Sequence, residues 1–270
     1  MGRGVPVMAG DSSGAGWRLP ALLWVTVAGA ILASCSPART PVPAPAPSGP
    51  PEVEAAAALG HARELARELG ARAPGSQEEQ AASVYVTAHL QQAGYAVFLD
   101  GVPVEDLVRS TNVVARPPAG GAPEVVVVAP YGTPPEESDG GAAAGLVLEL
   151  ARALRVRSPE HAAGFALLGA EHAAAGPLGS RRLAEDLAED APGALVVVVG
   201  DVESDAGCLA AGGAEGLVGR LTPTCPETPT GVADASRRVF AAAGLETAAV
   251  SGDLDRVATA LLRLLEGTEA

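Results

Sequence analysis

The sequence predicts an α/β domain of three layers, in which a mixed, mostly parallel β-sheet carries helices on both faces. From about residue 55, short apolar runs alternate with longer segments of helical periodicity. The runs are continuous and rich in valine, like EVVVVA at 124–129, which is typical of strands buried on both faces. Polar residues follow several runs directly, at the carboxyl ends of strands where α/β proteins place their sites.

Each predicted element has its own signal. The helical segments space Leu, Ala and Val three and four residues apart, whereas the strands are short apolar runs bounded by Gly, Pro or polar residues. The predicted helices span 55–70, 77–93, 140–156, 177–188, 230–243 and 253–265, and the predicted strands span 95–99, 111–115, 124–129, 164–170 and 194–199. The stretch GGAEGLVG (212–219) is not a dinucleotide-binding motif, because its spacing is wrong and no clear strand–helix pair surrounds it.

Length and charge limit the classes of protein to which the chain can belong. Its 270 residues suffice for one domain of about 200 residues with additional segments. The net charge is -14, and every basic residue is an arginine. An acidic chain without a basic run argues against nucleic acid as a partner, because binding to phosphates needs a positive patch.

The N-terminus has the features of a secretory leader. Arg18 precedes an apolar run at 19–33 that is shorter than the roughly 20 apolar residues of a membrane span. The run ends in Leu-Ala-Ser-Cys, which resembles the lipobox of bacterial lipoproteins. The resemblance implies a signal peptide at 1–34, an acylated Cys35 and a protein held on a membrane of the cell envelope. An uncleaved N-terminal anchor is the alternative.

The remaining chain divides into a tether and a domain. Residues 35–54 are rich in Pro and small residues, which favours an extended, polyproline-like tether. The α/β domain is expected over 55–270. If Cys35 carries lipid, Cys208 and Cys225 remain, and in an oxidising compartment we expect them to form a disulfide. Two unpaired thiols are the alternative.

An ordered series of motifs points to a family. The series comprises RAPGS (72–76), STNVVAR (110–116), VVVVAPYGT (125–133), SDGGAAAGLVLELARAL (138–154), FALLGAEHAAAGPLGS (165–180) and VVVVGDVES (197–204). In order and spacing it resembles the di-zinc aminopeptidases of metallopeptidase family 28, from about residue 57 to 266. The resemblance implies a zinc-aminopeptidase-like fold. It also implies two zinc ions that share a carboxylate and activate a water, with a glutamate as general base.

The site residues of that family can be carried over one position at a time. Asp139 corresponds to the bridging carboxylate, Glu171 to the general base, His172 to the metal ligand that follows the base, and Asp201 to the ligand at the end of the next strand. The first ligand of the family is a histidine in a His-Tyr-Asp stretch, for which this chain has Pro130-Tyr131-Gly132.

Two further stretches depart from the family. A later Ser-Asp-His stretch corresponds to Ala235-Ser236-Arg237, ahead of Phe240. The last ligand, a histidine in a loop before the final helix, has no counterpart, because residues 244–250 run through Ser251 and Gly252 directly into that helix. With two of five ligand positions lacking a donor, each zinc would keep two protein ligands, fewer than the three that catalytic zinc usually has.

These departures predict a domain without the two-zinc site and without aminopeptidase turnover. We expect no cofactor and a role as a binding or scaffold module for a peptide or protein ligand. The alternative is a metal-dependent exopeptidase in which Asp139, His172 and Asp201 hold one zinc ion. An amidohydrolase-type activity, which also needs a metal, is a third reading.

The same side chains also have structural explanations. Asp139 could cap the helix that follows it, Glu171 and His172 could be solvated loop residues, and Asp201 could satisfy backbone donors at a strand end. In an inactive domain, Glu171→Gln is expected to leave folding unchanged.

Overall fold

The computed structural model describes residues 52–105, 107–117, 120–133, 141–155, 157 and 161–267. The predicted signal peptide, Cys35 and nearly all of the predicted tether lie outside these residues. Asp139 also lies outside them. The first described helix begins at Ala55, at the predicted start of the domain.

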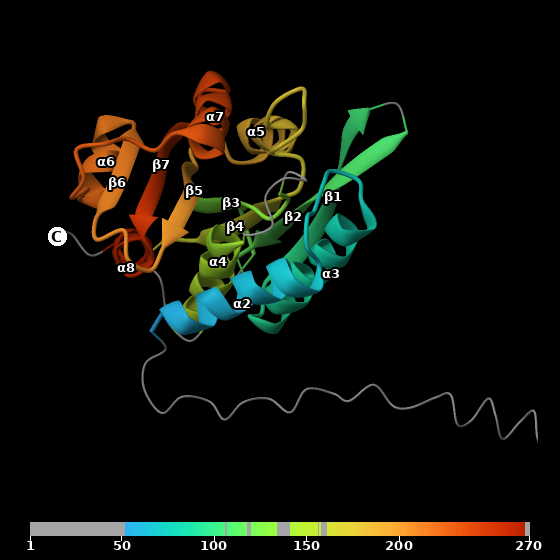
Figure 1. The fold of residues 1–270 in the computed structure, drawn as a ribbon. Helices are drawn as coiled ribbons and strands as arrows, with labels where there is room; N and C mark the ends of the chain where they lie inside the picture. The colour runs from blue at the N-terminus through green and yellow to red at the C-terminus, as the bar shows by residue number, and fades with distance from the viewer. Residues whose placement is uncertain are drawn as a thin grey trace, which may run out of the picture. The chain divides into compact units, whose positions relative to one another are not determined.

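A seven-stranded mixed sheet forms the centre of the domain (Figure 1), with the strand order β1-β2-β4-β3-β5-β7-β6. Neighbours among β4, β3, β5 and β7 pair in parallel, whereas β1 and β2 at one edge and β6 at the other are antiparallel. The predicted mixed sheet of an α/β domain is confirmed. The strands are β1 (Ala96–Glu105), β2 (Val108–Arg116), β3 (Val125–Pro130), β4 (Ala163–Leu168), β5 (Leu195–Glu203), β6 (Leu209–Gly213) and β7 (Glu246–Asp253).

Helices cover both faces of this sheet, as the sequence predicts (Figure 1). One face carries α2 (Ala55–Glu68), α3 (Gln77–Gln92), α4 (Ala142–Leu154), α6 (Glu215–Leu221) and α8 (Leu254–Leu265). The other face carries α5 (Leu178–Asp190) and α7 (Gly231–Ala242). In the described part of the chain, none of the helices has both the length and the apolar character that crossing a bilayer requires.

The valine-rich strands bury both of their faces because side chains alternate along a strand. In β3, Val125 and Val127 pack with α4 and the helices beside it, whereas Val126 and Val128 pack with α5 and α7. All four are at most 2% exposed. Complete burial of a valine side chain stabilises a fold by roughly 1.5–3 kcal/mol, so this short strand is a major anchor of the core.

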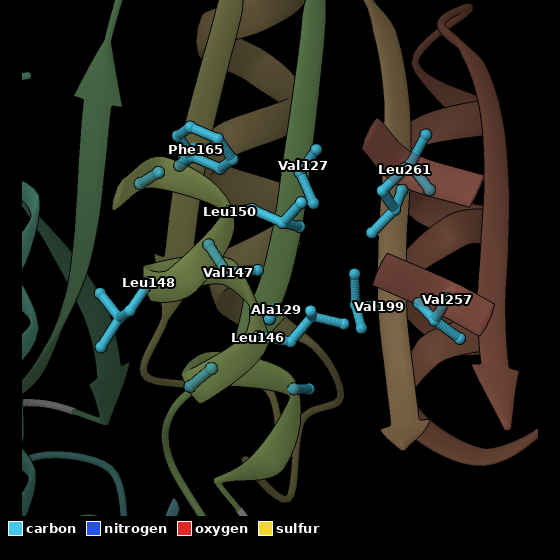
Figure 2. Close-up of a cluster of buried hydrophobic side chains, with 14 of the residues drawn as sticks. Val127, Ala129, Leu146, Val147, Leu148, Leu150, Phe165, Val199, Val257 and Leu261 are labelled. Carbon is cyan, nitrogen blue, oxygen red and sulfur yellow. The ribbon is translucent and has the colours of Figure 1, made fainter. Parts of the chain in front are cut away.

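Helix α4 fills the centre of the larger core (Figure 2). Figure 2 shows Leu146 and Leu150 of α4 beside Val127 and Ala129 of β3. All but two of the thirteen residues of α4 are buried, which explains why its sequence is apolar on every side. Its N-cap residue is Gly141. Capping of this helix by the Asp139 side chain stays a prediction, because Asp139 lies outside the described residues.

Two strands and a helix were not predicted. LAAGG (209–213) forms the edge strand β6, residues 215–221 form α6, and β7 occupies 246–253. The statement that no strand–helix pair surrounds residues 212–219 is therefore wrong, although β6 is an antiparallel edge strand. β6 and β7 are rich in Ala and Gly, and their strand conformation comes from pairing with neighbours rather than from a marked apolar run.

A polar cluster lies in the contact between α2, α3 and α4. His61 Nδ1 lies 2.7 Å from the hydroxyl of Tyr85, and His61 Nε2 lies 3.4 Å from Oε1 of the buried Glu149. Arg152 donates from Nε to the other Glu149 oxygen at 2.8 Å. The ring of His89 packs against the rings of His61 and Tyr85, each with centroids 4.6 Å apart. Burial and the neighbouring His61 lower the pKa of His89 to about 4.

His89 should therefore make the domain less stable in mild acid. The unfolded chain takes up a proton at His89 near pH 6.5, whereas the folded chain resists it down to about 4. The contribution of neutral His89 to the free energy of unfolding is thus fully present above pH 6.5 and is lost as the pH falls toward 4. The loss is about 2 kcal/mol after allowance for solvent screening of this half-buried ring. Urea unfolding at about pH 7.5 and about pH 4.5 should show a smaller loss for His89→Gln than for wild type.

His161→Gln is the control, because His161 lies at the surface beside Glu124. Because this variant keeps His89, it should retain the loss of stability in acid that His89 causes. An identical loss for wild type and His89→Gln would contradict this role of His89.

Candidate functional site

The predicted site residues follow the carboxyl ends of three neighbouring strands. Tyr131 comes directly after β3, Glu171 and His172 follow β4, and Asp201 lies near the end of β5. These strands are adjacent and parallel in the sheet, so their ends meet at one edge. The side chains do not all turn toward this edge.

Glu171 points into the protein and is only 4% exposed. Its Oε1 accepts a hydrogen bond from the backbone N–H of Ser180 at 2.7 Å, and its Oε2 accepts one from the hydroxyl of Ser180 at 2.6 Å. The hydroxyl of Ser236 donates to the same Oε2. Ser180 lies in the first turn of α5 and Ser236 lies in α7, so the carboxylate joins the end of β4 to both helices on that face.

These contacts determine what Glu171 can do. A carboxylate has about four acceptor sites, and three of them are filled. Burial raises the pKa of Glu171 and outweighs the opposite effect of its hydrogen bonds. The interpretation of Glu171 as a solvated loop residue is therefore wrong. The side chain is a buried link between three elements.

The backbone around Glu171 is shaped to fit it. Gly179 packs so closely that a Cβ atom on it would lie 2.8 Å from Glu171 Oε1 and 2.7 Å from Oδ1 of Asn112. Asn112 of β2 donates from Nδ2 to the carbonyl of Gly179 at 2.9 Å and is fully buried. Position 179 therefore accepts only glycine while Glu171 and Asn112 keep these places.

The partners of Glu171 were not predictable from its local sequence. Ser180 is the third residue of α5, nine positions after Glu171, and Ser236 is 65 positions away. One signal was present, because Ser236 stands where the resembled family has an aspartate. A serine hydroxyl at that position can donate a hydrogen bond to a buried carboxylate. An aspartate there would instead place a second negative charge beside it.

The residues that directly follow β3 are also inaccessible to a ligand. Tyr131 is fully buried, and its hydroxyl donates to the carbonyl of Thr111 at 2.7 Å. The buried Arg72 donates from Nε to the Tyr131 carbonyl at 2.6 Å, and from Nη1 to the carbonyls of Leu65 and Gly70. Burial raises the pKa of Tyr131, so its phenol stays neutral. Neither side chain is available to a ligand at the edge of the sheet.

Position 132 has no room for a side chain. A Cβ atom on Gly132 would overlap the carbonyl oxygen of Gly169, in the chain that leaves β4. The carbonyl oxygen of Arg72 also lies 3.3 Å from that Cβ position. Where the resembled family has an aspartate, two backbone segments here meet in direct contact. Pro130, where the family has its histidine, has no donor atom for a metal.

His172 and Asp201 differ from Glu171. His172 is half-buried in the loop after β4, and Asp201 has an exposed side chain. The pairing of β5 with β7 shifts register between Val199 and Val202, so Asp201 lies in a bulge. Bulges redirect side chains near strand ends, which accounts for the exposure of Asp201 in a strand that is otherwise buried.

The described residues do not fit a two-zinc centre. Among them, no three His, Cys, Asp or Glu side chains lie together in a way that could hold a metal ion. The one-ion arrangement of Asp139, His172 and Asp201 stays a prediction, because Asp139 lies outside the residues that the structure describes.

No family model matches the chain, and no curated protein matches it in sequence. Solved structures do match in fold. A leucine aminopeptidase precursor from Bacteroides thetaiotaomicron is 15% identical with a TM-score of 0.69, over 82% of this chain and 99% of the other. A glutaminyl cyclase of the same species, bound to N-acetylhistamine, is 14% identical with a TM-score of 0.68, over 82% and 100%. The Bacillus subtilis zinc aminopeptidase BSAP is 13% identical with a TM-score of 0.65, over 82% and 97%.

These similarities establish the fold. The described domain has the α/β architecture of zinc-dependent aminopeptidases and glutaminyl cyclases, and it spans nearly the whole length of each. The zinc-aminopeptidase-like fold that the sequence motifs predicted is confirmed.

Proposed function

We propose that this chain is a lipid-anchored envelope protein related to metallopeptidase family 28, whose domain acts as a non-catalytic binding or scaffold module. The fold is that of zinc aminopeptidases and glutaminyl cyclases. Relationship to the family rests on the ordered motifs between about residues 57 and 266. Its expected partner is a peptide or protein, and it carries no catalytic zinc.

The main observation that supports this proposal is the burial of Glu171. A general base needs a free lone pair within hydrogen-bond reach of the water that it deprotonates. In this domain the carboxylate is 4% exposed and accepts hydrogen bonds from Ser180 and Ser236. The group that would take a proton in an active relative serves here to hold α5 and α7 against the end of β4.

The structure of residues 130–132, at the end of β3, supports the same proposal. Pro130 offers no donor atom, and the backbone at Gly132 touches that at Gly169. A metal-bound water would need these ligand positions to lower its pKa toward neutrality. Without them, hydrolysis of a peptide bond has neither an activated nucleophile nor a free base.

The proposal is tested by metal content and turnover of the purified full-length protein in detergent. We expect no stoichiometric zinc and no turnover of leucyl or alanyl p-nitroanilides with added zinc, cobalt or manganese. N-terminal glutaminyl peptides should likewise remain uncyclised, which covers the activity named for the glutaminyl cyclases of the same fold.

The control variants use exposed residues, because substitution of the buried Glu171 would confuse chemistry with folding. Asp201→Asn removes a carboxylate of the predicted one-ion site, and Asp205→Asn removes an exposed carboxylate four residues later. Metal-dependent turnover that disappears in Asp201→Asn and persists in Asp205→Asn would overturn the proposal. It would favour an exopeptidase that uses Asp139, His172 and Asp201 on one ion.

The lipid anchor is a separate part of the proposal, supported by the lipobox at Cys35. Cys35→Ala should move the protein out of the membrane fraction or stop its processing, as followed by fractionation and by mass analysis of the N-terminus. Normal cleavage together with unchanged membrane retention would exclude acylation of Cys35.

A further inference from the structure

A second candidate site lies on the other side of the sheet. A cavity of about 480 Å³ opens between α8 and the segments on either side of the Cys208–Cys225 disulfide. Its base includes two buried apolar side chains, Leu209 of β6 and Ala260 of α8. The volume lies in the range of small-molecule sites, about 300–1,000 Å³.

One wall of the cavity carries two threonines. Thr224 accepts a hydrogen bond at Oγ1 from the backbone N–H of Leu209 at 2.9 Å, which leaves its O–H as a donor. Thr222 has a φ of 49°, the one positive φ of a non-glycine residue in the described part of the chain. Thr222 is the C-cap residue of α6, and a left-handed residue commonly ends a helix, so this conformation fixes where the wall begins. The disulfide holds this wall in place, since Cys225 directly follows Thr224 and Cys208 precedes Leu209.

The opposite wall is one face of α8. Arg256, Thr259, Ala260 and Arg263 line the cavity, and their spacing of three and four residues places them on the same side of the helix. The guanidinium of Arg256 is exposed and takes part in none of the ion pairs between described residues. Guanidinium and hydroxyl donors side by side suit a carboxylate.

The cavity also contains acidic groups. Asp253 and Asp255 lie at the end of the cavity near the start of α8. Asp253 uses Oδ1 to cap the helix, accepting from the backbone N–H of Arg256 at 3.2 Å, whereas Asp255 is exposed. The two aspartates balance the two arginines of the lining. A simple anion would meet the carboxylates, and a simple cation would meet the guanidinium groups.

We infer that this cavity binds a small zwitterion, namely a free α-amino acid with an apolar side chain. Arg256 and Thr259 receive the carboxylate, Asp255 receives the amine, and the surface of Leu209 and Ala260 accommodates an apolar side chain. Each part of such a ligand meets a group of matching character, and its net charge of zero matches that of the lining.

This site is independent of the one around Glu171. Ser180 and Ser236, the partners of Glu171, lie on α5 and α7, whereas α8 packs on the opposite face of the sheet (Figure 1). The inference therefore goes beyond the proposed function and does not depend on the absence of catalysis. A free amino acid is also the better probe, because no peptidase can hydrolyse it.

The test is titration calorimetry of the full-length protein with L-leucine, L-leucinol and N-acetyl-L-leucine. L-leucinol lacks the carboxylate, and N-acetyl-L-leucine lacks the charged amine. L-leucine should bind, and each analogue should bind about tenfold more weakly or worse, because each leaves a charged group of the site without its partner. Arg256→Gln should weaken binding of L-leucine by a similar factor and remove the preference for L-leucine over L-leucinol.

Arg63→Gln is the matched control, since Arg63 is an exposed arginine of another helix, α2. It should bind all three compounds as the wild type does. Three results would overturn the inference: no binding of L-leucine to the wild type, equal affinity for the three compounds, or the same affinity in Arg256→Gln and Arg63→Gln. Arg256 is exposed, so its substitution leaves the fold intact, which thermal unfolding of both variants verifies.

Discussion

Replacement of Glu171 by alanine should lower the free energy of unfolding by about 3 to 4 kcal/mol. The substitution leaves the backbone N–H of Ser180 and the hydroxyls of Ser180 and Ser236 without their acceptor, in a place that is almost closed to water. It also empties the space between β4, α5 and α7. Chemical denaturation followed by circular dichroism measures the change.

Glu171→Gln should cost less, about 1 kcal/mol, because the amide oxygen can accept from the backbone of Ser180 and the serine hydroxyls can rotate to accept from the amide. The sequence alone predicts no change in folding for this variant, and the same denaturation experiment distinguishes the two expectations. Glu189→Ala, an exposed carboxylate on α5, is the control and should change stability by about 0.5 kcal/mol or less.

A Glu171→Ala variant as stable as the wild type, or more stable, would contradict the structural role. Catalytic groups are often held at a cost to stability, so their removal can stabilise a protein. The sign of the change thus separates a carboxylate kept for the fold from one kept for chemistry.

Removal of the disulfide should have the next largest effect. The structure joins Cys208 to Cys225, with Cα atoms 5.5 Å apart and a sequence separation of 17. On the chain-entropy model, a cross-link over a loop of this length stabilises by about 3 kcal/mol. The double variant Cys208→Ser/Cys225→Ser should lose that amount in a denaturation experiment, and reduction should destabilise wild type equally.

The double variant is also the control for the reductant, because reduction has no bond to break in it and should change nothing further. Without reduction, alkylation and intact-mass analysis should find no free thiol on Cys208 or Cys225. Two alkylated cysteines in the unreduced protein would exclude the bridge, whatever the stability of the variant.

The parts of the fold that the sequence predicted are those where burial alone decides the structure. Continuous valine runs became β3 and β5 because helices cover both faces of these strands. The edge strand β6 and its neighbour β7 are rich in Ala and Gly, residues with little preference for strands. Their conformation depends on the pairing of β7 with both β5 and β6, which local sequence does not reveal.

The strand ends were predictable from the sequence, but the direction of the side chains that follow them was not. Polar residues after strands located the edge at which Glu171 and Asp201 lie, because strand ends are visible in the sequence. Whether Glu171 turns outward or inward depends on Ser236, which belongs to a helix 65 residues away. The contact between Gly132 and Gly169 depends likewise on how two loops approach in space.

The contact between Gly132 and Gly169 also determines which changes remain open to descendants of this chain. A histidine at position 130 would add a donor atom of the kind that the resembled family has there. An aspartate at 132 would overlap backbone atoms, which no side-chain rearrangement can relieve. A new side chain at 132 and a shifted backbone at 169 would have to arise together, since the first alone would lower the amount of folded protein in the cell. A metal-ligating side chain at position 132 is therefore out of reach of any single substitution in this chain.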